Sequence, residues 1–452
     1  RATCGLARML QKKSGAGQAG VCISYDSRKM SREFAAETAK VLCAHGIRTY
    51  LYSDLRPVPM LSYAVRSLGC AAGVMITASH NPAEYNGYKV YAGHGGQMEP
   101  EDSQVVMDEI SLVKGLEIPL ADLDDAYNCG LLSDVPAWVD DEYYGRVCSL
   151  IKRPEVFDQV RGDFMFVYTP LHGSAAVPVQ TVFSRAGVPG VYIVQDQQSP
   201  DGDFPTVSSP NPEDPEALAM AIALSECCGA DLCLGTDPDG DRMGAAIRCG
   251  NDSFMTLTGN QIGCLMLEYI LNAKRENGTL PENGAVIKSI VTTELADKIA
   301  ASYNVATHSV LTGFKYIAGK IGEFEHLENF EFLFGFEESY GYMAGSFVRD
   351  KDAVQACLLT AEMAAWYKLR GMTPYDGLEE LYGKYGYYLD KVASIHKEGK
   401  KGAEQISAIM QRMRGDKPSE LGGFKVLKIR DYLSETTTDI RTGNTEPTGL
   451  PQ

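Results

Sequence analysis

The feature that most constrains the fold of this 452-residue chain is an alternation of strands and helices that occurs three times. In its first occurrence, short apolar runs predict strands at residues 21–25, 49–52 and 72–77, and the segments 31–44 and 59–68 predict helices between them. This order is typical of layered α/β structure. The chain is therefore expected to bury strands between layers of helices.

The alternation returns at two later places in the chain. The predicted elements are strands 165–168, 191–194 and 231–235 with helices 175–186 and 215–228, then strands 285–289, 306–311 and 332–336 with helices 293–303 and 315–323. No detailed sequence repeat accompanies it, so we expect three related α/β domains with mixed sheets. The expected boundaries are residues 1–158, 159–256 and 257–386, with a smaller α+β domain at residues 387–452.

Charge and composition narrow the function. A net charge of −17 argues against a nucleic-acid partner or an anionic membrane surface. It does not exclude an anionic substrate, because a local basic cluster can reverse the field around a site. No uninterrupted apolar run reaches the roughly 18 residues of a membrane span. The 12 scattered cysteines and the lack of a secretion signal favour reduced thiols and a cytoplasmic protein.

The first segment with chemical potential is residues 77–82 (Thr-Ala-Ser-His-Asn-Pro), directly after a predicted buried strand. Ser79 at a strand end beside His80 can act as a nucleophile or a phosphoryl carrier. The same residue types are also typical of an ordinary turn. This segment alone leaves both interpretations open.

The second segment, residues 235–242 (Gly-Thr-Asp-Pro-Asp-Gly-Asp-Arg), places carboxylates at Asp237, Asp239 and Asp241. Three carboxylates around a tight turn can direct oxygens at one hard cation, and they repel one another without it. An EF-hand would need a later Glu where Arg248 stands. The pattern favours an Mg²⁺ site for phosphoryl transfer over a solvated acidic turn.

Two further segments could contact a phosphorylated sugar. Residues 335–341 (Gly-Phe-Glu-Glu-Ser-Tyr-Gly) carry Glu337 and Ser339, which would face the same side of an extended segment and bind hydroxyls. A solvated turn is the alternative. Residues 349–352 (Arg-Asp-Lys-Asp) supply cations for phosphate, or else salt bridges at the start of a helix.

Together these segments resemble the α-D-phosphohexomutase superfamily. Residues 77–89 are similar to its active-site serine loop, residues 237–242 to its metal loop, and residues 335–341 to its sugar-binding loop in the glucose-preferring branch. Further similar segments are residues 26–28, 171–173, 312–315 and 349–352. Their order and spacing agree as far as the region of residue 390.

The resemblance implies an isomerase of the phosphoglucomutase type, with three α/β domains and a smaller fourth domain, which we expect to be truncated in this chain, around a central cleft. It implies that a sugar 1-phosphate and 6-phosphate interconvert through a phosphoserine enzyme, with glucose 1,6-bisphosphate as intermediate and activator. Ser79 would carry the phosphoryl group and share one Mg²⁺ with Asp237, Asp239 and Asp241. The implied partner is a small phosphosugar, and the enzyme would be a monomer or homodimer.

The remaining implied roles belong to cations and sugar contacts. Arg28 and Lys89 would neutralise charge on the phosphoryl group, and either Lys89 or His80 would be the general acid and base. The implied substrate-binding residues are Arg242, Thr312, Gly313, Lys315, Glu337, Ser339, Arg349 and Lys351.

The C-terminal region departs from the family pattern. The family's fourth domain carries a phosphate-binding loop, and residues 441–447 (Arg-Thr-Gly-Asn-Thr-Glu-Pro) are similar to it only at their ends. They follow a predicted strand at residues 424–429 too closely for the usual sheet to precede the loop. We therefore expect an incomplete fourth domain, weak binding of the substrate phosphate and low turnover.

Several alternatives share these segments. A phosphopentomutase or a hexose 1,6-bisphosphate synthase would use the same serine and metal loops. A phosphomannomutase more often has a histidine where Tyr342 stands. A non-catalytic phosphosugar-binding protein is the rival from another class. A Mg²⁺-dependent phosphatase would need a water-activating base, and the sequence suggests none.

Overall fold

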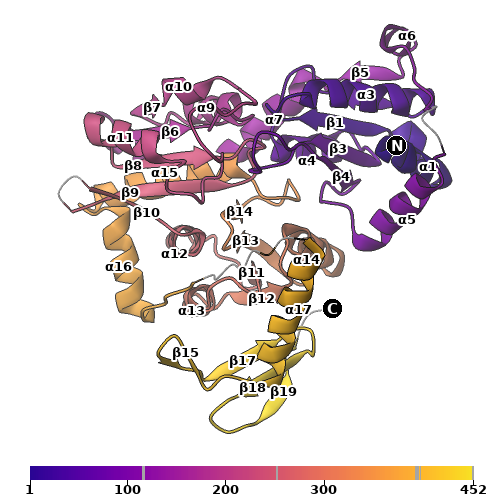
Figure 1. Ribbon diagram of the computed structural model, residues 1–452. Coiled ribbons are helices and arrows are strands. Elements are labelled where there is room, and N and C mark those ends of the chain that lie inside the picture. Colours follow the sequence, from indigo (N-terminus) through magenta and orange to yellow (C-terminus); the bar gives the residue numbers. More distant parts are fainter. Residues whose placement is uncertain (115–117, 251–252, 392–396, 398, 450–452) are drawn as a thin grey trace. The chain divides into compact units, whose positions relative to one another are not determined.

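A computed structural model describes residues 1–114, 118–250, 253–391, 397 and 399–449 (Figure 1). The chain divides into two compact units, one of residues 1–308 and 312–388 and the other of residues 309–311 and 389–452. The larger unit contains three sheets, each covered by helices.

The first sheet has the strand order β4-β3-β1-β2-β5, and only β4 runs antiparallel to its neighbour. Its strands are β1 (Val21–Tyr25), β2 (Thr49–Leu51), β3 (Ala72–Ile76), β4 (Tyr88–Ala92) and β5 (Leu132–Asp134). Its helices are α1 (Ala2–Lys12), α2 (Ala16–Ala19), α3 (Ser31–Ala44), α4 (Val58–Ser67), α5 (Pro100–Ser111), α6 (Leu123–Asn128) and α7 (Ala137–Cys148). Every residue of β1 and β3 is buried, as expected of central strands between helices.

The second sheet has the order β10-β9-β8-β6-β7, with β9 antiparallel to both of its neighbours. Its strands are β6 (Phe166–Thr169), β7 (Val191–Ile193), β8 (Leu232–Thr236), β9 (Met243–Cys249) and β10 (Ser253–Thr256). The accompanying helices are α8 (Val156–Gln159), α9 (Ala176–Arg185), α10 (Gln195–Gln198) and α11 (Ala219–Cys228).

The third sheet has the order β12-β11-β13-β14, with β14 antiparallel to β13. Its elements are α12 (Gly259–Glu276), β11 (Gly284–Ser289), α13 (Leu295–Ser302), β12 (Ala306–Val310), α14 (Phe314–Leu327), β13 (Glu331–Glu337) and β14 (Gly341–Met343). Two helices follow, α15 (Ala353–Leu369) and α16 (Pro374–Tyr385). Helix α15 is buried on nearly all sides and contacts α7, α8 and α9 as well as α12 and α16.

The three sheets share a core of four strands in the same order, β4-β3-β1-β2, β9-β8-β6-β7 and β14-β13-β11-β12, which confirms that the domains are related α/β units. Strands β5 and β10 are additions to the first and second sheets. In each sheet a buried parallel strand leads into an antiparallel neighbour, through β3–β4, β8–β9 and β13–β14. The links between these strand pairs are residues 77–87, 237–242 and 338–340. The three segments singled out from the sequence therefore occupy equivalent positions in three equivalent folds.

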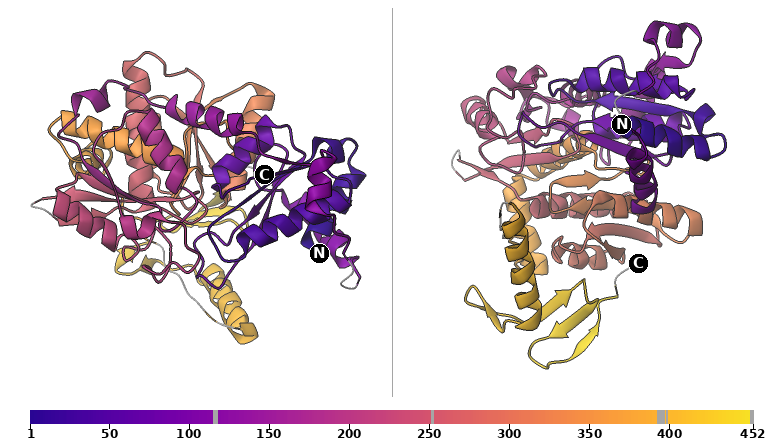
Figure 2. Two further views of the ribbon diagram at one scale, coloured as in Figure 1. Left: turned by 90° about the horizontal axis from the view of Figure 1, so that it is seen from above. Right: turned by 45° about the vertical axis from the view of Figure 1, so that its right-hand side comes forward.

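The smaller unit is rich in β-structure. It contains helix α17 (Gly399–Gly415), the hairpin β15 (Glu420–Leu421) and β16 (Phe424–Lys425), and the sheet β17 (Lys428–Asp431), β18 (Thr436–Asp439) and β19 (Thr445–Pro447). Arg414 and Lys417, at and just beyond the end of α17, bond to Asp431 and Thr438, and Figures 1 and 2 draw the helix beside this sheet. Residues 441–447 span the turn into β19 and β19 itself, in a hairpin the sequence did not predict.

Three predictions are corrected by the structure. The strand predicted at residues 424–429 is divided, because residues 424–425 belong to β16 and residues 428–431 form β17 in a separate sheet. The helix predicted from residue 215 begins at Ala219, because residues 215–218 form turns beside Pro215. Ser339 does not lie in an extended segment, because residues 338–340 form the turn between β13 and β14. Strand alternation therefore cannot place Glu337 and Ser339 on one side.

Candidate active site

Ser79 lies in the link between β3 and β4, in a backbone conformation that is rare for a residue with a side chain. Its φ is 55°, in the left-handed region, and its N–H donates to Thr77 Oγ1 at 2.8 Å. Ser79 Oγ lies 3.2 Å from Asp237 Oδ2 and 3.3 Å from His80 Nδ1. Strain of this kind is often retained where a side chain must be presented for chemistry.

Arg28 holds the loop that carries Ser79 through hydrogen bonds from its guanidinium. Its guanidinium donates to the carbonyl oxygens of Ser79 (2.6 Å), Pro82 (2.8 Å) and Tyr85 (3.0 Å), and also to that of Asn81. The side chain is fully buried, with Nε 3.4 Å from Asp26 Oδ2. The structure thus ties Arg28 to the backbone of the serine loop.

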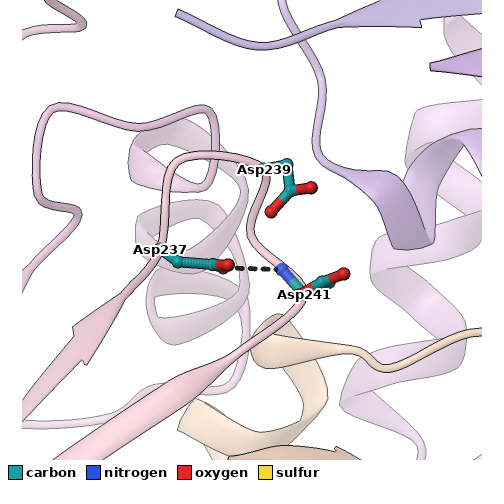
Figure 3. Close-up of side chains that lie close together, drawn as sticks. All are labelled: Asp237, Asp239 and Asp241. Atoms are coloured by element: carbon teal, nitrogen blue, oxygen red, sulfur yellow. Dashed lines mark hydrogen bonds between the residues drawn. The ribbon is translucent and has the colours of Figure 1, made fainter. Parts of the chain in front are cut away.

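The tight turn after β8 brings the three aspartates together around one loop (Figure 3). One oxygen from each carboxylate lies within 4.8 Å of the others. Asp237 Oδ1 accepts the N–H groups of Asp241 and Arg242, both at 3.0 Å, which closes the turn. Asp239 Oδ1 and Asp241 Oδ1 are buried without a hydrogen-bond partner.

Two lysines from other domains reach the second oxygens of this cluster. Lys89 on β4 donates to Asp239 Oδ2 at 2.8 Å, and Thr77 Oγ1 donates to the same oxygen at 3.3 Å. Lys351 lies 3.1 Å from Asp241 Oδ2. The two carboxylate oxygens without hydrogen-bond partners are thus available to bind a cation, whereas the oxygens paired with the lysines hold the metal loop in place.

The electrostatics of the cluster follow from burial. Burial raises the pKa of Asp237 well above its usual range, and Asp239 and Asp241 raise it further. Burial also raises the pKa of Asp241, with Asp239 adding to the effect. Burial opposes ionisation of Asp239 too, but Lys89 and Lys351 hold the pKa of that carboxyl below its ordinary value. Buried oxygens that lack partners and carboxylates that repel one another fit a divalent cation bound by oxygen ligands.

The pKa values of the two candidate proton carriers, His80 and Lys89, are shifted in opposite directions. Burial and the nearby Arg242 lower the pKa of His80 to about 4. Burial acts to lower the pKa of Lys89 as well, but Asp239 and Asp241 outweigh it and raise that pKa. His80 is therefore a neutral imidazole near neutral pH, and Lys89 is a charged ammonium.

The segment after β13 meets the segment before α14. Glu337 Oε1 accepts the N–H of Gly313 at 2.7 Å, and burial raises the pKa of Glu337. Gly313 has a φ of 120°, which favours glycine at this position. Thr312 is exposed, whereas Ser339 and Lys315 are half-buried. The structure thus joins Glu337 to the 312–315 segment and leaves Thr312 open to solvent.

The two cations of residues 349–352 have different surroundings. Lys351 meets the metal loop, but Arg349 is buried and donates to the Ser346 carbonyl and to Glu325 on α14. Asp352 accepts the N–H groups of Val354 and Gln355 and caps α15. This segment therefore begins helix α15 and also supplies Lys351 to the metal loop. The Arg349 guanidinium contacts Glu325 instead of the three aspartates.

Arg242 is mostly buried and pairs with Glu213, with its Nε 3.9 Å from Asp241 Oδ1. Glu213, Thr77 and Glu338 are site neighbours that sequence reasoning missed. Glu338 accepts the hydroxyls of Ser289 (2.9 Å) and Thr292 (3.1 Å). Only Thr77 carried a signal, since a threonine at the end of an apolar strand commonly bonds to the following turn.

The site combines a strained serine from the first domain, a buried carboxylate cluster that fits a cation from the second, and lysines from the first and third. These are the parts of a phosphoryl-transfer enzyme. Comparison with known proteins identifies the family to which this enzyme belongs. Residues 1–114, 142–250 and 258–385 match α/β/α domains I, II and III of the phosphoglucomutase/phosphomannomutase family.

Full-length relatives agree with these domain matches. The chain is 38% identical to a phosphoglucomutase of Staphylococcus epidermidis over 96% of this chain and 77% of the relative, and 36% identical to one of Staphylococcus aureus over 99% and 79%. Parafusin, a Paramecium phosphoglucomutase, has a similar fold, with a TM-score of 0.69 at 17% identity over 99% of this chain and 80% of that protein. The chain belongs to the phosphoglucomutase/phosphomannomutase family, and it is an isomerase of the phosphoglucomutase type. No helix in the described ranges is long and apolar enough to cross a membrane.

Proposed function

We propose that this chain interconverts glucose 1-phosphate and glucose 6-phosphate, with Ser79 as the phosphoryl carrier and glucose 1,6-bisphosphate as intermediate. The observation that carries the proposal is the position of Ser79 Oγ, 3.2 Å from Asp237 Oδ2, in a cluster where two buried carboxylate oxygens have no hydrogen-bond partner. A hydroxyl beside a cation site is suited to receive and release a phosphoryl group.

Asp237, Asp239 and Asp241 would hold one Mg²⁺, which neutralises charge on the phosphoryl group when bound. Lys89 adds positive charge at the same place, since its ammonium is fixed by Asp239. His80, as a neutral imidazole, would accept the proton of the Ser79 hydroxyl as that oxygen bonds to the phosphoryl group and pass it to the sugar oxygen that leaves, because its Nδ1 lies 3.3 Å from Ser79 Oγ. Arg28 positions the loop through its carbonyl oxygens.

The substrate contacts come from the third domain and the metal loop. Glu337 and Ser339 would bind sugar hydroxyls, and Thr312, Gly313 and Lys315 line the adjoining segment. Lys351 and Arg242 would bind phosphate, because both cations already lie near Asp241. A preference for glucose rests on the Glu-Glu-Ser sequence of the turn and on the phosphoglucomutase relatives.

The test is a substrate panel on the purified chain with Mg²⁺ and glucose 1,6-bisphosphate. We expect conversion of glucose 1-phosphate to glucose 6-phosphate to exceed conversion of mannose 1-phosphate and ribose 1-phosphate, and EDTA to abolish it. Faster turnover of ribose 1-phosphate would replace the proposal with a pentomutase. Phosphosugar binding without turnover, in a protein that also fails to phosphorylate Ser79, would favour a binding protein.

A further inference from the structure

The segment Leu171-His172-Gly173 resembles a family motif, yet none of its side chains belongs to the site described above. It follows β6 and lies in the second domain. Leu171 and His172 both have positive φ, 46° and 59°, and both are buried. Two consecutive residues with side chains in this conformation are strained, so the surrounding contacts must hold them there.

His172 fastens a neighbouring loop of the same domain. Its Nδ1 lies 3.1 Å from the Ser199 carbonyl oxygen, which can only accept, so this nitrogen donates. Its Nε2 lies 2.9 Å from Thr206 Oγ1. The backbone of His172 also donates to Gln197 at 2.9 Å and accepts from Asp201 at 3.2 Å. Residues 197–206 are thus held at both ends by one histidine.

The loop fixed in this way reaches across to the first domain. Phe204, also strained with a φ of 48° and buried, places its ring 5.1 Å from the guanidinium carbon of Arg28. A Cβ on Gly202 would come within 2.5 Å of the Lys29 backbone nitrogen, so the two backbones are in close contact. An aromatic face over a guanidinium attracts it and restricts its orientation.

Arg28 in turn fixes the serine loop through four carbonyl oxygens, those of Ser79, Asn81, Pro82 and Tyr85. The guanidinium is planar, so its donors reach these four oxygens only in one orientation. The Phe204 ring and Asp26 set that orientation. The left-handed backbone of Ser79 is therefore supported by a contact that begins in the second domain.

The same motif also fixes the metal loop. Ser174 donates to the Pro238 carbonyl oxygen through its backbone N–H (2.8 Å) and through its hydroxyl (2.7 Å). A Cβ on Gly173 would lie 2.7 Å from Pro238 Cα and 2.9 Å from the Asp237 carbonyl oxygen. The turn at residues 171–174 thus contacts the metal loop directly and the serine loop through Phe204 and Arg28.

We propose that His172 and Phe204 are positioning residues for Ser79, and that the turn at residues 171–174 sets the serine loop and the metal loop in register. The effect of these residues on catalysis rests on the proposed role of Ser79. Their positioning of the serine loop and the metal loop does not depend on that role. Displacing a reacting group by about 1 Å can cost on the order of a hundredfold in rate, so this support has a measurable consequence.

The test replaces Phe204 with Leu, which keeps an apolar side chain and removes the ring. Amide hydrogen exchange in residues 78–86 should accelerate, and the rate at which glucose 1,6-bisphosphate phosphorylates Ser79 should fall about tenfold or more. Phe204→Tyr should retain both properties. Thr206→Val, which removes one hydrogen bond of His172 and one of Gln197, should give a smaller change in the same direction.

Phe254→Leu, the same substitution at a less buried ring, is the control. Its ring lies 5.5 Å from the guanidinium carbon of Arg248 in the same domain, outside the serine and metal loops. If Phe204→Leu changes exchange in residues 78–86 no more than Phe254→Leu does, the proposal is wrong. If the parent chain never acquires a phosphate on Ser79, the proposed function fails instead, and the exchange data still decide the mechanical part.

Discussion

At the scale of single residues, the ion pair between Lys89 and Asp239 balances part of the charge of three buried carboxylates. Replacing Lys89 with Met leaves Asp239 buried without its nearest cation. We expect unfolding free energy without metal to fall by about 3–5 kcal/mol. Mg²⁺ should stabilise the variant more than the parent, because the added cation replaces the missing charge.

Denaturant unfolding with and without Mg²⁺ measures this. Lys40→Met, which removes a more exposed pair with Glu37 on α3, is the control and should cost less than about 1 kcal/mol. Equal stabilisation of the Lys89 variant and the parent by Mg²⁺ would show that the aspartates do not share a cation site with this lysine.

Asp352 provides a prediction of pH dependence away from the cluster. Burial raises the pKa of this carboxyl to about 6, against opposing hydrogen bonds from Gln355 and Tyr143. The folded state therefore holds a proton that the unfolded state releases, and this stabilisation is complete below about pH 4 and lost as pH rises through about 6.

Asp352→Asn removes that titration. The unfolding free energy of the variant minus that of the parent should therefore increase by about 2–3 kcal/mol between about pH 4 and pH 7. Denaturant titrations at a series of pH values test it. A difference that does not vary with pH would mean that Asp352 ionises in the folded state as readily as in the unfolded one.

At the scale of elements, the turn at residues 171–174 gives a sharp test of metal-loop support. Gly173→Ala places a Cβ 2.7 Å from Pro238 Cα, so the metal loop must shift. We expect Mg²⁺ affinity to fall by about tenfold or more, as for other residues that orient metal ligands. Calorimetric titration with Mg²⁺ measures it.

Gly145→Ala on α7 is the matched control, since its new Cβ would meet nothing within 4 Å. It should leave Mg²⁺ binding unchanged and raise stability slightly, because alanine favours a helix over glycine. Unchanged Mg²⁺ affinity in Gly173→Ala would show that the metal loop does not depend on this packing.

The elements also show what the sequence could and could not predict. Strand β1 and helix α3 lie at the predicted residues, because apolar runs and 3.6-residue periodicity were clear there. For helix α15, residues 349–352 indicated a helix start as one of two interpretations, but its extent was not predicted, because apolar residues lie on all its sides and periodicity needs a polar face. At Ser339 the sequence allows either an extended segment or a turn, and the structure has the turn, because local sequence does not show where a strand reverses.

At the scale of the whole molecule, residues 349–353 connect the three domains of the larger unit. Asp350 accepts Tyr91 Oη at 3.1 Å and Gln97 Nε2 at 3.0 Å from the first domain, and Arg349 N–H donates to Ser62 Oγ at 2.8 Å. Lys351 and the N–H of Ala353 reach the metal loop at Asp241 and Gly240.

Tyr91→Phe tests this connection because it removes one hydrogen bond to a buried carboxylate. The expected loss of unfolding free energy is about 1–3 kcal/mol. The measurement is denaturant unfolding, and Tyr192→Phe on the exposed edge of the second sheet is the control. A loss no larger than that of the control would argue against a stabilising contact at Asp350.

Contacts between distant parts of the chain explain why some candidate site residues could be predicted from the sequence and others could not. Ser79 and the three aspartates lie in short segments that resemble family loops, so they could be proposed as site residues without a structure. Arg28 and Arg349 were correctly noted as cations, but only the fold shows that one bonds to the serine-loop backbone and the other to Glu325. Phe204 had no signal, because its relevance comes from a contact between domains.

The central claim is that Ser79 carries the phosphoryl group, and intact-mass measurement tests it most directly. The purified chain, incubated with glucose 1,6-bisphosphate and Mg²⁺, should gain the mass of one phosphoryl group and lose it when excess glucose 1-phosphate is added. Ser79→Ala should show neither change. A phosphoryl group that still appears in Ser79→Ala, or a parent chain that never gains one, would contradict the account.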